Sequence, residues 1–411
     1  MTHKRTVRFA AVAVALGLVA AACGGDDDTA DEPAAEEPAA EEPAAEEPAA
    51  EEPAAEEPAA EEPAAEEPAE MTLADVCPSP IVIQTDWFPE SEHGALYNLI
   101  GDDYVVDAEN QTVTGTLVGA GNTPTDIQIQ VRAGGPAIGF AAPRVQMYTD
   151  DSIHLGYTST DGQVLAWEDA PLISVIAPLE INPQIIMWDA DAWPDVETIA
   201  DLGTAGTTIN IFGGGGFSDV FVAKGIWTAE QVDPSYDGSP ARFIAEGNIA
   251  QQGFASAEPY NYEFVFEEYG KAPKYQLLHD AGYPIYSQTL GVKPTELENL
   301  RGCLEMFVPM VQTSTVEFSG NPDRANAMII DTVAQVGSFW VYDEGVANYA
   351  VETMSALGLH SNGPDSTVGN MDEARVQGVI DDIAAAGLPV PEGLTAADTF
   401  TNEFIDESIG F

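Results

Sequence analysis

The chain has 411 residues, with 69 acidic side chains against 13 basic ones and a net charge of −56 at neutral pH. Residues 1–70 hold 20 of the acids and 3 of the bases, so residues 71–411 keep a net charge of −39. This negative field excludes nucleic acid and anionic lipid surfaces as partners, because both carry phosphate charges. Since one hydrophobic core rarely exceeds about 300 residues, the 341 residues after position 70 predict two lobes.

Residues 1–22 are typical of an export signal. Basic residues precede a run of small apolar residues at 9–22, which is too short to span a bilayer comfortably. The run ends at Cys23 and is similar to the lipobox of bacterial lipoproteins, although Ala20 replaces the leucine that this motif usually has. The resemblance implies that Cys23 is diacylated and anchors the chain to the outer side of the cell membrane. The alternative is an ordinary secretory signal followed by a free cysteine.

Residues 23–70 predict an extended acidic spacer. The pentad Glu-Glu-Pro-Ala-Ala repeats along this segment, and proline recurs every five residues from Pro33 to Pro68. Each proline removes a helix hydrogen bond and clashes with the preceding turn, and the glutamates repel one another. We therefore expect a disordered, solvated, polyproline-like stalk without a packed core, between the membrane anchor and the folded part.

From residue 71 onward, short β-branched runs alternate with helical patterns. The β-branched runs predict strands at residues 80–87, 125–132, 152–159, 172–178, 184–189, 207–212 and 276–280. The helical patterns between them lie at residues 92–101, 196–202, 218–224, 240–245 and 262–269. After residue 295 the pattern is chiefly helical, at residues 296–312, 322–335, 345–357 and 371–386. This order of elements predicts an α/β fold with mostly parallel sheets.

Ligands of α/β sheets bind where strand-to-helix loops meet at the carboxyl ends of the strands. Five predicted loops are rich in glycine, hydroxyl or aromatic residues, at 85–97, 132–136, 158–161, 212–219 and 256–262. The fourth loop has four consecutive glycines before a helix, which leave backbone N–H groups open to a ligand; a flexible turn is the alternative. It lacks the lysine of a P-loop and the spacing of a dinucleotide fingerprint, so we expect no nucleotide cofactor.

Two cysteines remain in the folded part, Cys77 and Cys303. In an oxidising compartment they predict a disulfide, and two buried thiols are the alternative. Neither has the paired Cys or His spacing of a zinc or redox site, so we expect no metal. Hydrolase and metalloprotease motifs are also missing, and the histidines of this part occur singly, at His93, His154, His279 and His360. We therefore expect no catalytic residues.

The segment after the first predicted strand resembles a known family. It contains Asp86, Trp87, Phe88 and Pro89, followed by His93, Leu96 and Tyr97, and this pattern is similar to the opening of thiamine-pyrimidine-precursor-binding proteins. Those proteins are type II solute-binding proteins of ABC importers, alongside the nitrate, taurine and alkanesulfonate binders. Glu90 stands where the pyrimidine binders usually have asparagine, and Ala95 where they have glycine.

The resemblance implies a type II periplasmic-binding-protein fold, in which two lobes joined by hinge strands close on a ligand cleft. Lobe 1 is expected at residues 71–176 and 290–411, and lobe 2 at residues 177–289. The candidate hinge strands are the segments 172–178 and 285–293.

Loops from both lobes then form the expected ligand site. Trp87 is expected to stack on a flat ligand, and Tyr260 or Phe217 to face it from lobe 2. Glu90 or Glu258 is expected to accept a hydrogen bond from a ligand amino group. Hydroxyl groups and backbone amides are expected to give small polar contacts, and His93 either to hydrogen-bond the ligand or to cap its own helix. The complete expected set is Trp87, Glu90, His93, Gly134, Gly135, Ser159, Thr160, Gly214, Gly215, Phe217, Glu258 and Tyr260. Core packing is the alternative for each aromatic residue.

The implied function is a lipid-anchored, monomeric receptor that delivers a small solute to ABC permease subunits, without chemistry or cofactor of its own. A neutral or cationic heterocycle such as an aminopyrimidine is favoured, because anion binders need converging donors and the folded part has ten basic residues, with Arg132 and Arg144 near the second loop. Riboflavin-like molecules, alkanesulfonates, taurine and nitrate stay open. Two other classes are a precursor synthase, whose fungal relatives carry a cysteine-rich motif that this chain lacks, and a surface adhesin.

Overall fold

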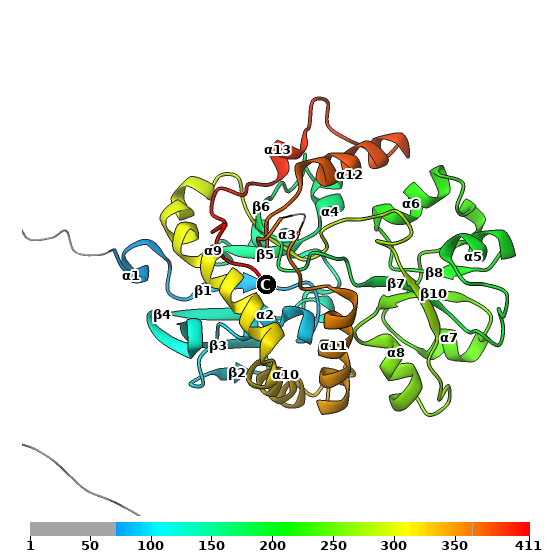
Figure 1. The fold of residues 1–411 in the computed structure, drawn as a ribbon, viewed down its shortest axis with the longest axis horizontal. Helices are drawn as coiled ribbons and strands as arrows, with labels where there is room; N and C mark the ends of the chain where they lie inside the picture. Colours follow the sequence, from blue (N-terminus) through cyan, green and yellow to red (C-terminus); the bar gives the residue numbers. More distant parts are fainter. Residues whose placement is uncertain (1–70, 364) are drawn as a thin grey trace, which may run out of the picture. The chain divides into compact units, whose positions relative to one another are not determined.

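The computed structural model describes residues 71–363 and 365–411 (Figure 1). The predicted export signal, the lipidation site at Cys23 and the acidic spacer lie outside these residues. The described part contains a seven-stranded and a five-stranded sheet, each covered by helices, which form two lobes. The predicted two-lobed α/β fold is confirmed. None of the described helices combines the length and apolar character needed to cross a bilayer.

The sheet of lobe 1 has the strand order β2-β3-β4-β1-β5-β12-β6. Its central strand β1 is parallel to β4 and to β5, whereas the other neighbours in the sheet are antiparallel. The three apolar residues at the start of β1 are all buried, as expected for a strand covered on both faces. The strand bounds are β1 (Ile81–Gln84), β2 (Val105–Asp107), β3 (Thr112–Gly119), β4 (Thr123–Arg132), β5 (Leu155–Thr158), β6 (Ile173–Ile176) and β12 (Thr289–Val292).

The sheet of lobe 2 has the order β11-β7-β10-β8-β9, and β7 is antiparallel to both of its neighbours. The prediction of mostly parallel sheets is wrong, because only four of the ten pairings between the described strands are parallel. Short links such as the one between β3 and β4 permit only antiparallel neighbours. The strand bounds are β7 (Gln184–Trp188), β8 (Ile209–Asn210), β9 (Val232–Asp233), β10 (Ala250–Phe254) and β11 (Lys274–Leu277).

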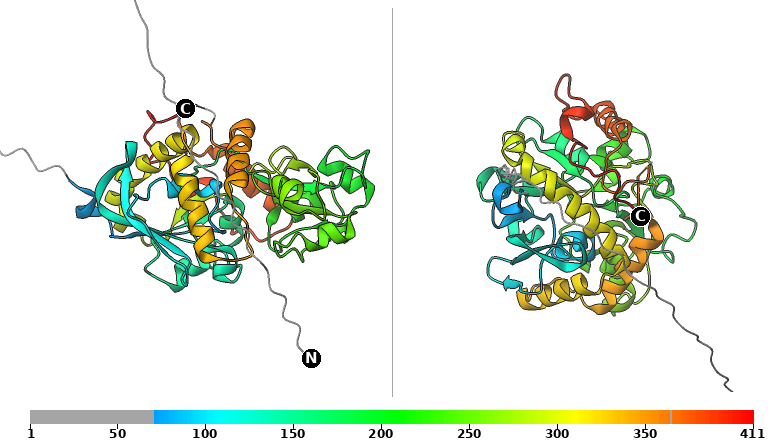
Figure 2. Two further views of the ribbon diagram at one scale, coloured as in Figure 1. Left: turned by 90° about the horizontal axis from the view of Figure 1, so that it is seen from below. Right: turned by 60° about the vertical axis from the view of Figure 1, so that its left-hand side comes forward.

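Helices after β12 cover lobe 1, and the yellow α9 crosses its sheet in Figures 1 and 2. All four predicted C-terminal helices are present, and α9 continues eight residues past its predicted end at residue 312. The predicted helix at 92–101 stops at Tyr97, and that at 262–269 is replaced by a single wide turn, η5 (Asn261–Val265). The helix bounds are α1 (Leu73–Val76), α2 (Gly94–Tyr97), α3 (Pro143–Thr149), α4 (Thr160–Leu165), α5 (Ile199–Ala205), α6 (Gly216–Ala223), α7 (Ala241–Glu246), α8 (Glu258–Tyr260), α9 (Leu297–Gly320), α10 (Asp323–Val336), α11 (Glu344–Leu357), α12 (Glu373–Ala385) and α13 (Ala396–Thr399).

Close packing against α9 fixes the N-terminal part of lobe 1. A side chain at Gly94 would lie 2.2 Å from the buried ring of Phe318, so only glycine permits α2 and α9 to approach this closely. A disulfide joins Cys77, just after α1, to Cys303 in α9, with 4.7 Å between their Cα atoms. Both contacts connect the start of the described chain to a helix more than two hundred residues away.

Two segments connect the sheets, residues 177–183 between β6 and β7 and residues 278–288 between β11 and β12. We call them the crossing segments. Helix α12 packs beside them, and its buried residues belong to the same hydrophobic cluster as those of α6 in lobe 2. The exact lobe boundaries stay a prediction, since α12 contacts α4 of lobe 1 as well.

Candidate functional site

A cavity of about 690 Å³ lies between the two lobes. Lobe 1 contributes the loops that follow β1, β4 and β5, and lobe 2 contributes the loop after β8 and the segment around the end of β10. All five loops singled out in the sequence supply residues to its wall. The cavity is large enough for a substituted heterocycle, since binding pockets for small molecules commonly have volumes of about 300–1,000 Å³.

Eight of the predicted site residues line this cavity, namely Trp87, Glu90, Gly135, Ser159, Gly214, Gly215, Phe217 and Glu258. The other four do not. His93 is completely buried behind the wall, and Thr160 is also buried, close to the amide of Tyr286. Gly134 donates its N–H to the carbonyl of Trp87 at 2.8 Å and so supports the wall from behind. Tyr260 packs against Tyr349, with 5.5 Å between the ring centroids.

Trp87 follows β1 and presents its half-buried indole to the cavity. Two glycines allow the indole to lie there. A Cβ atom at Gly135 would lie 2.7 Å from Cε3 of the indole, and one at Gly238, in lobe 2, would lie 3.2 Å from Cη2. Both glycines also have positive φ angles, of 56° and 87°, which other residues rarely adopt. The loops of both lobes therefore close around this one side chain.

The ring that faces Trp87 from lobe 2 is Phe212, which the sequence reasoning missed. Its centroid lies 5.8 Å from that of Trp87, with an interplanar angle of 68°. Phe217, the predicted alternative, has a side chain packed among Phe221 and Trp227 in the core of lobe 2. The sequence contained a signal for Phe212 as a site residue. Phe212 ends the strand-like run immediately before the glycines and therefore stands at the carboxyl end of β8.

Of the other aromatic side chains that line the cavity, three have rings close to Trp87 or Phe212. Trp340, from the link between α10 and α11, has its centroid 6.0 Å from that of Trp87, and Phe140 lies at the same distance. Tyr236 lies 4.6 Å from Phe212. We call these five residues the aromatic box. The dense aromatic run from Phe339 to Tyr342 was a signal for Trp340, but it falls between two predicted helices, where no loop was selected.

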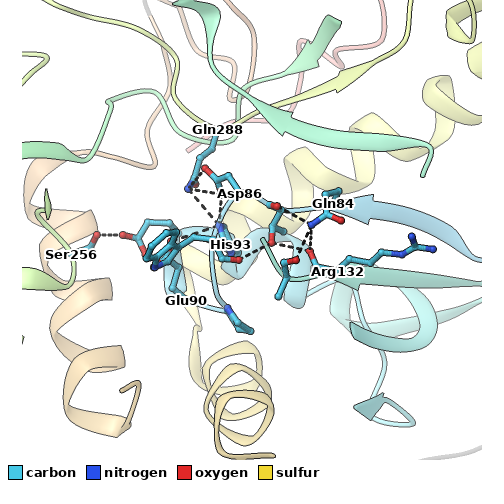
Figure 3. A network of polar contacts seen from close by, with 12 residues as sticks. Gln84, Asp86, Glu90, His93, Arg132, Ser256 and Gln288 are labelled. Carbon is cyan, nitrogen blue, oxygen red and sulfur yellow. Dashed lines mark hydrogen bonds and ion pairs between the residues drawn. The ribbon is translucent and has the colours of Figure 1, made fainter. Parts of the chain in front are cut away.

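The carboxylates of Asp86 and Glu90, in the loop after β1, line the same cavity as this box, and Figure 3 shows them with their polar neighbours. Asp86 accepts a hydrogen bond from Nε2 of His93 at 3.0 Å, and Gln288 approaches the same carboxylate at 3.4 Å. Glu90 is 3 % exposed, and its nearest polar partner is Nε2 of His93 at 3.7 Å. Burial, followed by the charges of Glu92, Asp86 and Glu258, raises the pKa of Glu90 well above its ordinary value.

One further carboxylate connects this network to lobe 2, and another belongs to lobe 2 itself. Ser256, in lobe 2, donates its hydroxyl to Glu92, and Figure 3 shows this contact bridging the lobes. Burial raises the pKa of Glu92 as well. Burial also raises the pKa of Glu258, to about 7, although the amide of Phe254 donates to its carboxylate at 2.7 Å and opposes the shift.

Arg144, at the start of α3, is the basic residue of the cavity wall. Among the residues that the structure describes, the other nine Lys and Arg side chains all pair with carboxylates, and Arg144 alone does not. Desolvation lowers the pKa of Arg144, and the charge of Asp161 partly opposes this shift. Three more polar atoms of the wall have no partner within the described residues, the buried hydroxyls of Tyr157, Thr158 and Ser287.

No protein-family model matches the chain, and no curated protein matches it. Among solved structures, the ligand-binding component of an ABC-type import system from Staphylococcus aureus, with zinc bound, covers 79% of this chain and 97% of its own, at 10% identity and a TM-score of 0.50. The described residues have the two-lobed fold of periplasmic binding proteins. The predicted resemblance to this group is thus confirmed for the fold. Within the described residues, no group of three or more His, Cys, Asp or Glu side chains is arranged to hold a metal ion.

Two alkanesulfonate-binding proteins are also similar to this solute-binding fold. SsuA from Xanthomonas axonopodis pv. citri, bound to MOPS, has 17% identity and a TM-score of 0.47, and covers 79% of this chain and 99% of its own. The periplasmic aliphatic sulphonate-binding protein SsuA from Escherichia coli has 13% identity and a TM-score of 0.46, with coverages of 79% and 92%. These likenesses concern the fold and leave the ligand open.

Proposed function

We propose that this protein is the extracytoplasmic solute-binding component of an ABC importer and has no catalytic activity. It captures a small molecule in the cavity between its lobes and delivers it to the permease subunits as a monomer, while a lipid at Cys23 and the acidic spacer keep it on the outer face of the cell membrane. The observation that carries this proposal is the cavity of about 690 Å³, walled by loops from both lobes beside two crossing segments. A ligand in such a cavity favours closure, because closure gives it contacts with both walls.

The solute that we propose is a small planar heterocycle of the thiamine-pyrimidine-precursor kind. Trp87 and Phe212 come from opposite lobes, and a flat ring can contact both because aromatic faces and edges attract each other. Glu90 and Glu258 are acceptors suited to an exocyclic amino group. The proposal therefore combines an aromatic wall for the ring with carboxylates for its edge.

A second candidate is an anionic solute such as an alkanesulfonate. Arg144 favours it, because this guanidinium lines the cavity and has no carboxylate partner among the described residues. Asp86, Glu90 and Glu258 oppose it, since these acidic side chains line the same cavity. Riboflavin remains a third possibility of compatible shape.

The experiment is a thermal-shift screen of the protein without its export signal, using hydroxymethylpyrimidine, thiamine, riboflavin, taurine, an alkanesulfonate and nitrate. We expect a pyrimidine compound to raise the melting temperature, because a ligand that binds only the folded state stabilises it by mass action. Small-angle scattering with that compound should show a smaller radius of gyration. A rise caused only by sulfonates or nitrate would select the second candidate. Turnover of any compound would contradict a pure binding function, and a cavity that binds none of them would favour the adhesin class.

A further inference from the structure

The aromatic box has the arrangement that positively charged ligands favour. Trp87 is the central wall, and the rings of Phe140, Phe212 and Trp340 meet it at interplanar angles of 48°, 68° and 87°. These rings are inclined to one another rather than stacked, so several of them can contact one ligand with a face or an edge. The face of an aromatic ring is its negative region, and it attracts a cation placed within about 6 Å of the centroid.

Glu90 lies in the same wall and lacks a partner of opposite charge. Its side chain is almost fully buried, and its closest polar contact is the 3.7 Å approach of His93. The imidazole is already hydrogen-bonded to Asp86, so even a protonated His93 balances no more than one of the carboxylates gathered there. Burying an ionised carboxylate without a neighbouring cation costs free energy. Because Glu90 lies beside a cavity, a bound ligand can supply that cation.

The other residues that the structure describes do not supply such a cation. Nine of the ten basic side chains in the described residues are held in ion pairs elsewhere, and none of these nine lines the cavity. The tenth, Arg144, lies near Gly162 and has Asp161 as its opposing charge. The cavity wall thus contains five acidic side chains and one basic side chain.

We propose that the solute is a small organic cation whose charged nitrogen group sits in the aromatic box and faces Glu90. The inference rests on the proposed function, because it takes the cavity to be the ligand site, and it narrows the solute to one charge class. Tyr157 and Ser287 contribute unpartnered hydroxyls that can bind polar substituents of that solute. An adjoining cavity of about 510 Å³ shares Phe140, Tyr236 and Trp340 with the box and gives space for a longer substituent.

A proton accompanies this binding step. In the empty protein, burial and the charges of Glu92, Asp86 and Glu258 raise the pKa of Glu90, which favours the protonated form of its carboxyl group. His93 is the one imidazole in reach of that carboxyl group. An incoming cation stabilises the ionised form, and the proton leaves to the buffer. Cation binding is therefore expected to release protons, whereas binding of a neutral compound is not.

The test uses matched probe pairs that differ in charge and hardly in shape. Benzamidine and benzamide are the planar pair, and choline and its carbon isostere dimethylbutanol are the non-planar pair. Titration calorimetry is carried out near neutral pH in phosphate and in Tris, whose different protonation heats report released protons. We expect the cation of a pair to bind at least about tenfold more tightly than its neutral partner and to release protons.

Glu90→Gln is the variant that tests the assignment. It keeps the shape and removes the charge, so the preference for the cation should fall about tenfold and proton release should decrease. Glu92→Gln is the control, because it makes the same change in a buried glutamate two positions away that does not line the cavity. The ratio of the two affinities should change much less in Glu92→Gln than in Glu90→Gln, because Glu92 acts on the site only through its charge on Glu90. Unfolding curves of both variants verify that they fold.

The outcomes separate this inference from the proposed function. Equal affinity for benzamidine and benzamide would contradict a cationic solute and would agree with a planar solute. Preference for choline over its isostere, without binding of either planar probe, supports the cation and overturns the planar heterocycle. The inference is also wrong if neither cation binds at millimolar concentration, or if Glu90→Gln keeps the full preference.

Discussion

The guanidinium of Arg375 lies 2.7 Å from the carboxylate of Glu180, Nη1 to Oε1. The same guanidinium donates to the backbone carbonyls of Glu180, Pro284 and Ile285, and it lies 3.7 Å from the ring centroid of Tyr286. Glu180 belongs to one crossing segment, and the other three residues belong to the second. One side chain of α12 thus holds both connections between the lobes at the point about which they would have to bend.

Replacing this arginine should destabilise the protein strongly. Arg375→Met leaves the half-buried Glu180 without a partner and frees several carbonyls, so we expect a loss of about 3–5 kcal/mol in the free energy of unfolding. Urea unfolding followed by tryptophan fluorescence measures it. Arg301→Met, which breaks a pair with the exposed Glu298, is the control and should cost less than about 1 kcal/mol. Equal losses in both variants would contradict the role given to Arg375.

The disulfide between Cys77 and Cys303 should hold in the exported protein. The bond encloses a long loop, with 226 positions between the cysteines, so its removal frees much of the unfolded chain. We expect the Cys77→Ser, Cys303→Ser double variant to lose about 2–5 kcal/mol of unfolding free energy. Peptide mapping without reductant should detect the linked peptides. Two thiols titratable in the denatured, unreduced protein would show that the bond is absent.

Glu258 should stabilise the empty protein as the pH falls from about 7 towards 4.5, whereas His360, whose pKa burial lowers to about 4, acts in the opposite sense in the same range. Burial raises the pKa of Glu258 from its ordinary 4.5 to about 7, so in this range the folded state binds the proton more tightly than the unfolded state. Its contribution is complete below pH 4.5 and is lost as the pH rises through 7, with a size of about 3 kcal/mol. Urea unfolding at several pH values measures the slope.

Glu258→Gln should make this part of the pH profile flatter. Glu90 and Glu92 also have raised pKa values, so a reduced slope remains in the variant. Carboxylates with lowered pKa values, such as Asp150 at about 2, act in the opposite sense at more acidic pH and do not obscure the window. An unchanged slope in Glu258→Gln would show that this glutamate is not the source.

Substitutions of Phe212 and Phe217 should have different effects, one mainly on ligand affinity and the other mainly on the free energy of unfolding. Phe212→Leu removes a ring that faces Trp87 across the cleft, and we expect about a tenfold loss of affinity for whichever screened compound binds, with little change in unfolding free energy. Phe217→Leu alters a ring packed in the core of lobe 2 and should cost more stability than affinity. Calorimetry and urea unfolding on both variants give the comparison. The reverse pattern would assign the facing ring to Phe217.

The sequence indicated the two lobes through chain length and the family resemblance, and the loops of the site through local patterns. Apolar runs followed by glycine and aromatic residues mark strand ends whatever the rest of the chain does. Strand β10 was missed for a physical reason. It contains the buried polar residues Gln251 and Gln252, whose amides bind Tyr262 and the N–H of Phe212, so it lacks an apolar signature.

Long-range pairings explain the other omissions. Trp340 stands between two helices, and the packing of Phe88 against it and the hydrogen bond from its Nε1 to the carbonyl of Pro89 hold the indole at the cavity. Glu92 meets Ser256 across 164 positions, and no local pattern couples them. Phe217 was preferred to Phe212 because both flank the same glycines, and the choice depends on which way the first turn of α6 faces.

Gly135 and Gly238 have a consequence for the range of solutes that the cleft can accept. They come from opposite lobes and both contact the indole of Trp87, so the thickness of this ring limits how closely the two lobes can approach each other. A methyl group at either position would keep the lobes further apart and enlarge the cavity for the solute. If the cavity binds a solute as proposed, its selectivity for size depends on these two residues, which have no side chain.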